Sequence, residues 1–206
     1  MMLNLKYFYL LLFFDILCVK CIRNEISIIM NKTYLDYYII DHSYYSDISN
    51  VVINGITASI YNYSKLLNQE INNVTFKFNK YLNTTESMFG LLHNILYIDM
   101  SNFVSLKVTN TVGMFASCIR LKSLNLNNFD TSLVTNMFTM FRGCYSLESL
   151  NLSNFNTSSV TNMRSMFEFC FSLISLDITN FDTKSVTDMN YMFCSCESLQ
   201  SLDINN

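Results

Sequence analysis

Residues 134–159 read VTNMFTMFRGCYSLESLNLSNFNTSS, and this stretch decides the fold because it recurs along the chain. Copies of it begin at evenly spaced positions, namely Val108, Val134, Val160 and Val186. A degenerate copy covers about residues 82–107. A unit of this size cannot bury its own apolar face, so repetition at a fixed period is typical of coils that stack and share one core.

Each period divides into two halves with different spacing. In the first half the apolar residues follow steps of three, three, one, three and three, at Val134, Met137, Met140, Phe141, Cys144 and Leu147. These steps fit one stripe of a helix, with Thr131 or Thr135 placed to cap its start. The second half, residues 147–152, ends in the alternation of a short strand. We therefore expect an α/β leucine-rich-repeat solenoid with one short parallel strand and one helix per coil.

The domain organisation follows from where the repeat begins. We expect a solenoid of about five repeats over residues 82–206, closed at its N-terminal end by an irregular cap over 22–81 with a degenerate strand unit near 71–78. Residues 1–21 carry an apolar run after Lys6 and fit a secretory signal peptide; the alternative is an N-terminal cap helix of a cytosolic protein. The run is too short to span a bilayer as a helix, so no integral membrane span is expected.

Charge and composition disfavour several classes of function. The chain has 13 basic and 16 acidic residues, a net charge of −3, so it has no basic excess to neutralise nucleic acid. Hydrophobic residues make up 50% and charged residues 14%, which is typical of a folded protein. The two histidines, His42 and His93, form no recognisable catalytic motif, and the sequence has no glycine-rich phosphate loop. We expect a non-enzymatic protein without a metal or cofactor.

Four cysteines recur in register, at Cys118, Cys144, Cys170 and Cys196. One thiol per coil makes a linear column, whereas zinc needs four ligands that converge, so a place in the core is expected. Cys194 instead occupies a column that holds Ala116, Arg142 and Glu168 in the other copies. We therefore expect Cys194 to be exposed and able to form an intermolecular disulfide.

Two further columns fall just after each expected strand. The first is predicted to stack as a buried aromatic spine and consists of Phe103, Phe129, Phe155 and Phe181. The second is predicted to satisfy backbone groups at the turn and consists of Asn102, Asn128, Asn154 and Asn180. The recurring Met-Phe pair is also expected in the core.

The outward side chains of the expected sheet form the candidate binding face. They are small hydroxyl, amide and carboxylate groups apart from one tyrosine, and they comprise Tyr97, Asp99, Ser123, Asn125, Asn127, Ser149, Asn151, Ser153, Ser175, Asp177, Thr179, Ser201 and Asp203. Protein-binding hot spots favour Trp, Tyr and Arg, so this face suits a weak, polar or multivalent contact. The alternative is a solvated sheet surface without a ligand.

The detailed pattern resembles a known family. The L-x-x-L-x-L segments resemble leucine-rich repeats, and the Asn-Phe-Asp/Asn-Thr, Val-Thr-x-Met and Met-Phe-x-x-Cys elements, as in residues 154–170, resemble the BspA-like surface-protein repeat of bacterial lipoproteins and adhesins. The resemblance covers about residues 82–206. It implies a solenoid used in surface adhesion or host interaction, but it assigns no ligand to particular residues.

The leading hypothesis is a non-enzymatic, secreted or surface-exposed repeat protein that mediates protein–protein or host interaction. Its partner would be a macromolecule, either a protein or a cell-surface component. The first alternative is an intracellular leucine-rich-repeat adaptor or effector. The second is a self-associating structural protein, because the last repeat shows no polar cap and end-to-end association through this C-terminal end would cover it.

Overall fold

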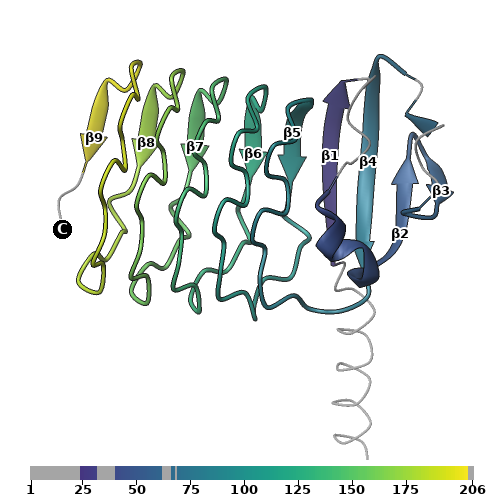
Figure 1. Cartoon of the computed structure of the whole chain (residues 1–206), viewed down its shortest axis with the longest axis horizontal. Helices are drawn as coiled ribbons and strands as arrows, with labels where there is room; N and C mark the ends of the chain where they lie inside the picture. The colour runs from purple at the N-terminus through teal and green to yellow at the C-terminus, as the bar shows by residue number, and fades with distance from the viewer. Residues whose placement is uncertain (1–23, 32–39, 62–65, 68, 204–206) are drawn as a thin grey trace, which may run out of the picture.

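The computed structural model describes residues 24–31, 40–61, 66–67 and 69–203, which form a cap and a row of stacked coils (Figure 1). The predicted signal peptide, residues 1–21, lies outside the described residues. The cap contains β1 (Glu25–Asn31), the 3-10 helix η1 (His42–Asp47), β2 (Ile48–Ile53), β3 (Ile56–Ala58) and β4 (Ile71–Phe78). The coils contain β5 (Ile95–Asp99), β6 (Ser123–Asn125), β7 (Ser149–Asn151), β8 (Ser175–Asp177) and β9 (Ser201–Asp203).

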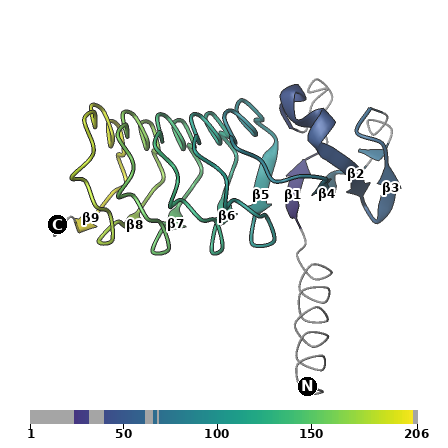
Figure 2. The ribbon, with the colours of Figure 1, turned by 90° about the horizontal axis from the view of Figure 1, so that it is seen from below.

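The prediction of an α/β solenoid with one helix per coil is wrong. The described ranges contain no α-helix, and the 3-10 helix η1 lies in the cap. The strands form a six-stranded mixed sheet in the order β3-β2-β4-β1-β5-β6 and a three-stranded parallel sheet in the order β7-β8-β9. Figure 2 shows the coils from below as loops of chain stacked one behind another, without a helix on any side.

The segment expected to be helical is a series of turns. The apolar residues that lie three apart close these turns, because the N–H groups of Val134, Met140, Cys144 and Leu147 donate to the carbonyls of Thr131, Met137, Phe141 and Cys144 at 2.9–3.2 Å. A turn and a helix both bring residues i and i+3 together. The spacing of three is therefore a signature of consecutive turns here, and Thr131 and Thr135 cap no helix.

Two positions in each coil adopt a left-handed backbone, which interrupts any helix. In the third coil they are Thr139, with φ 55°, and Gly143, with φ 72°. The equivalent positions in the other coils are also left-handed, at Ser87, Gly113, Ser165 and Tyr191 in one column and Leu91, Ser117, Phe169 and Ser195 in the other. Non-glycine residues avoid this region, so an α-helix cannot pass through two such positions in close succession.

Backbone hydrogen bonds in this segment run between coils. The N–H groups of four alternate residues, Met137, Thr139, Phe141 and Gly143, donate to carbonyls of the next coil along the chain, at Asn162, Arg164, Met166 and Glu168, over 2.8–3.1 Å. We call these four positions of every coil the turn row. The same four bonds join each pair of consecutive coils from Thr85 to Cys194, with distances of 2.6–3.1 Å. These turn-row N–H groups therefore all point towards the C-terminal end of the stack.

Two columns of phenylalanine rings run through the core. Phe141 is fully buried and stacks between Phe115 at 5.5 Å and Phe167 at 5.4 Å, with ring planes within 8° of parallel. The other column is that of the expected spine: Phe103, Phe129 and Phe155 follow one another at 6.2–6.3 Å, and they and Phe181 are at most 3% exposed. Three asparagine amides beside this column donate to carbonyls of the preceding coil, from Asn128, Asn154 and Asn180.

The cap joins the stack through β1, which pairs antiparallel with β4 on one side and β5 on the other. Strand β4 covers the expected strand unit near 71–78, but it pairs antiparallel with β1 and β2 and so belongs to the cap sheet. The segment around η1 meets the first coil: the Asp41 N–H donates to the Met88 carbonyl at 2.9 Å, and the Tyr44 hydroxyl donates to the Glu86 carbonyl at 2.8 Å. Burial raises the pKa of Tyr44, so the phenol keeps the proton that it donates.

Candidate functional site

The residues of the candidate binding face lie in register on the parallel strands of the coils. In the first row Tyr97 pairs with Ser123, and Ser175 pairs with both Ser149 and Ser201. In the second row Asp99 pairs with Asn125, and Asp177 pairs with both Asn151 and Asp203. Strands β6 and β7 lie side by side in Figure 1, but no ladder joins them. The face is thus one row of strands in two hydrogen-bonded halves.

The second row also ends the strands. In the first four residues of this row, one side-chain oxygen accepts the N–H two residues further on, which is an Asx turn. The four bonds run to Asp99, Asn125, Asn151 and Asp177 from Ser101, Asn127, Ser153 and Thr179, at 2.9–3.2 Å. The second-row residues, which were expected to bind a partner, therefore also shape the turn. The third row of the face lies just beyond the strands and consists of Asn127, Ser153 and Thr179.

The C-terminal half of the face is hollowed. An open depression of about 630 Å³ lies over β7, β8 and β9, with its polar rim made of residues of the candidate face: Ser149, Asn151, Ser153, Ser175, Asp177, Thr179 and Ser201. Leu150 and Leu176, each 5% exposed, also line it. Asp177 is the one charged residue in this lining. Hydrogen bonds from the Thr179 hydroxyl and N–H lower the pKa of Asp177, so it is a carboxylate at neutral pH.

The N-terminal half of the face has an apolar neighbour that the sequence analysis missed. Tyr97 on β5 pairs with Ile29 on β1, and Ile29 pairs on its other side with Asn73 on β4. Ile29 is half-buried, between the fully buried Ile28 and Met30. The alternation of residues 25–31 could have indicated this strand from the sequence, because Ile26, Ile28 and Met30 point inwards and Ile29 does not. The cap sheet therefore extends the candidate face beyond the coils.

The recurring cysteines line the inside of the stack. Cys118, Cys144 and Cys170 are fully buried, whereas Cys196 in the last coil is half-buried. Each of the four thiols donates to a carbonyl of the preceding coil at 3.1–3.3 Å, at Phe89, Phe115, Phe141 and Phe167. Burial raises the pKa of the Cys118 thiol to about 12, and it also raises the pKa of Cys144 and Cys170. These thiols stay protonated at neutral pH, and thiols are poor nucleophiles.

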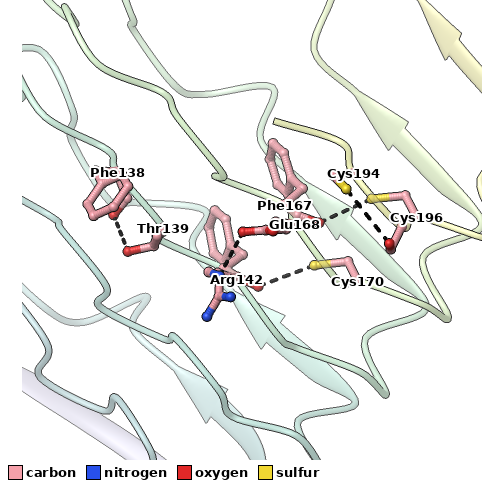
Figure 3. A network of polar contacts seen from close by, with 10 residues as sticks. Phe138, Thr139, Arg142, Phe167, Glu168, Cys170, Cys194 and Cys196 are labelled. Carbon is pink, nitrogen blue, oxygen red and sulfur yellow. Dashed lines mark hydrogen bonds and ion pairs between the residues drawn. The ribbon is translucent and has the colours of Figure 1, made fainter. Parts of the chain in front are cut away.

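Cys194 lies on the surface, in the same column as an ion pair (Figure 3). In this column the Arg142 guanidinium bonds the Glu168 carboxylate at 2.7 Å, and it also lies 5.1 Å from the centre of the Phe169 ring. Desolvation by itself would raise the pKa of Glu168, but the hydrogen bond and the charge of Arg142, with further contributions from Ser165 and Arg164, lower it overall. Cys194 adds an exposed thiol at the end of the column, 3.8 Å from the Ser195 hydroxyl.

The two histidines lie on the surface, His42 in η1 and His93 in the turn before β5. Asp41, next to His42, caps η1 by accepting the Ser43 N–H at 2.8 Å. In the part of the chain that the structure describes, no three His, Cys, Asp or Glu side chains gather as metal ligands. The same described residues contain no helix with the length and hydropathy needed to cross a membrane.

The regular register of strands, turns and side-chain columns from coil to coil defines a repeat protein. Comparison with protein families matches residues 83–206 to the family described as "Mycoplasma protein of unknown function, DUF285", and the chain belongs to this family. No curated protein matches the chain significantly. No solved structure matches it significantly.

Proposed function

We propose that this protein is a non-enzymatic, BspA-like surface protein that binds a host or partner macromolecule through the outward face of β5 to β9. The observation that carries the proposal is the depression over β7, β8 and β9, because residues from three successive repeats line it in register. Repeating the same groups on a parallel sheet offers a partner several equivalent contacts, which suits multivalent binding.

The chemistry of the depression suits a polar ligand surface. Ser149, Ser175 and Ser201 supply hydroxyl groups, and the Asp177 carboxylate is the only charge in the lining. The leucine side chains beneath contribute little exposed apolar area. Such a site favours hydrogen bonds to hydroxyl, amide or ammonium groups of a partner over an apolar anchor. The N-terminal half, with Tyr97 beside Ile29, offers a more apolar contact.

A charge placed in the depression tests this function. Ser175→Arg adds a long side chain to an exposed position of β8 at the centre of the lining. We expect it to weaken binding of the full chain to intact host cells or to isolated host surface components by at least about tenfold, because it fills the depression and opposes a cationic partner near Asp177. The measurement is a binding isotherm with the fluorescently labelled protein.

The matched control is Ser158→Arg, which makes the same change at an exposed position outside the lining. It should leave binding unchanged. Equal binding by both variants would exclude the depression as the site, and an absence of saturable binding by the unaltered chain would overturn the proposed function. The surface location is tested separately by antibody labelling of unpermeabilised cells that make the protein; labelling only after permeabilisation would contradict it.

A further inference from the structure

The second row of the binding face contains two pairs of Asn and Asp side chains that differ in their hydrogen bonds. On β5 and β6 the Asn125 amide nitrogen donates to the Asp99 carboxylate at 3.0 Å, and both residues are half-buried. On β7 and β8 the order is reversed, because Asn151 comes first and pairs in register with Asp177, and both residues are exposed. Among the described residues, no hydrogen bond joins Asn151 to Asp177. We call these two residues the open pair.

Each side chain of the open pair is held by its own turn. The Asn151 Oδ1 atom accepts the Ser153 N–H at 3.0 Å, and the Asp177 Oδ1 atom accepts the Thr179 N–H at 3.1 Å and the Thr179 hydroxyl at 2.7 Å. Within the described part of the chain, nothing bonds the Asn151 amide nitrogen or the second Asp177 oxygen. The pair therefore presents a fixed donor beside a fixed acceptor, and such preorganisation lowers the entropic cost of binding.

The lining of the depression over β7, β8 and β9 restricts the chemistry of a ligand. It contains the open pair but no basic and no aromatic side chain, so it offers neither a partner for an anion nor an anchor typical of protein–protein contacts. An ammonium group only donates, so it would bond Asp177 and leave the Asn151 amide without an acceptor. A phosphate or carboxylate group only accepts, and the charge of Asp177 repels it.

Two adjacent hydroxyl groups satisfy both members of the open pair at once. A hydroxyl both donates and accepts, so one can donate to Asp177 while its neighbour accepts from Asn151. The exposed hydroxyls of Ser149 and Ser175 lie in register on the same strands and add further donors and acceptors (Figure 1). Neighbouring strands lie about 4.8 Å apart, which is close to the advance of one unit in a linear chain of sugar rings. Successive coils can therefore contact successive sugar units.

We propose that the depression binds a neutral, linear glycan whose adjacent hydroxyl groups bridge Asn151 and Asp177. This inference rests on the proposed function, because it names the chemistry of the ligand at the same site. Leu150 and Leu176 line the floor and would contact the C–H groups of the sugar rings. Each contact is weak, but a glycan repeats its hydroxyl groups as the coils repeat theirs, which suits multivalent binding.

Periodate treatment tests the ligand class, because periodate cleaves the bond between two carbons that carry adjacent hydroxyl groups. Soluble host surface components compete with intact host cells for the fluorescently labelled full chain, after either protease digestion or periodate oxidation. We expect the digest to compete and oxidation to weaken competition by at least about tenfold. Undiminished competition after oxidation would overturn the glycan and leave a protein partner at the same site. Absence of saturable binding to untreated cells would overturn the proposed function and this inference with it.

An exchange of the open pair locates the contact. Asn151→Asp combined with Asp177→Asn copies the order of Asp99 and Asn125, so the amide can donate to the carboxylate within the chain. Net charge and both turn acceptors are kept. We expect the affinity for host surface components to fall by at least about tenfold, because the donor and the acceptor then bond each other and not the ligand.

The matched control is the same exchange at another column of the same two coils. Asn156 and Asp182 also accept N–H groups two residues further on, but they lie outside the lining of the depression. Asn156→Asp combined with Asp182→Asn should leave binding unchanged. Equal affinity of the two double variants would overturn the inference. If Ser175→Arg still weakens binding in that case, the depression remains the site and only the role of the open pair is wrong.

Discussion

Phe141→Ala is expected to lower the free energy of unfolding by about 3–5 kcal/mol, as measured by urea denaturation. The ring is fully buried in the third coil and stacks on both sides, against Phe115 and Phe167. Its removal leaves a cavity in the middle of the phenylalanine column, and the neighbouring rings are held by their own coils and cannot close it. The loss should therefore lie at the upper part of this range.

Tyr145→Ala is the matched control for this prediction. It removes an aromatic ring of similar size from the same coil, but Tyr145 is 43% exposed, and among the described residues its ring contacts only that of Phe171, at 4.9 Å. Its loss should cost about 1 kcal/mol, the value of a single aromatic pair at the surface. Similar losses for the two variants would show that the column of rings is not the core of the stack.

Raising the pH from 8 to 10 is expected to lower the free energy of unfolding by about 2 kcal/mol for each fully buried thiol, Cys118, Cys144 and Cys170. Burial raises the pKa of all three, that of Cys118 to about 12, so they stay protonated in the folded chain at pH 10. In the unfolded chain a thiol ionises with a pKa of about 8.5. Because the folded pKa lies above the unfolded one, the stabilisation is complete below about pH 8.5 and is lost as the pH rises towards the folded value.

Alanine variants isolate this effect from other groups that titrate in the same range. Cys144→Ala should be less stable than the unaltered chain at pH 8, yet its stability should fall by about 2 kcal/mol less between pH 8 and 10. If the unaltered chain and Cys144→Ala lose the same stability over this range, the thiol column is accessible to solvent in the folded chain.

The repeat and its register were predictable because they depend on the period alone. A shift by one repeat matches Tyr97 to Ser123 and Ser149 to Ser175, and the strands pair in this register. The alternation of residues 147–152 likewise indicated a short strand with Leu150 inwards, where β7 lies. Local pattern and global structure agree at these positions, so no further information was needed.

The helix was predicted wrongly because spacing alone cannot separate a helix from consecutive turns. Both conformations place Met137 and Met140 on one side. A hydrogen bond between coils decides between the two conformations. The N–H of Phe141 donates to the Met166 carbonyl in the next coil, whereas in a helix it would donate to a carbonyl one turn back. Gly113 and Gly143 were a local signal, because they mark the two left-handed columns, but serine, threonine, leucine and aromatic residues fill the same columns elsewhere.

The candidate site could be predicted only in part from the sequence. The repeat indicates which side chains share the outward face, but it does not show that β6 and β7 are unpaired or that the face is hollowed over β7 to β9. The contribution of Ile29 depends on the antiparallel pairing of β1 with β5, which joins segments far apart in the sequence. Such pairing has no counterpart in the periodic pattern.

The absence of helices from the described coils and the stacking of one coil on the next both depend on the direction of the turn-row hydrogen bonds. NMR scalar couplings across hydrogen bonds measure this directly in the labelled full chain. We predict a coupling between the amide nitrogen of Phe141 and the carbonyl carbon of Met166, and the equivalent coupling between Phe115 and Met140. A coupling from the Phe141 nitrogen to the carbonyl carbon of Met137, one helical turn back, would instead show an α-helix and would contradict the account.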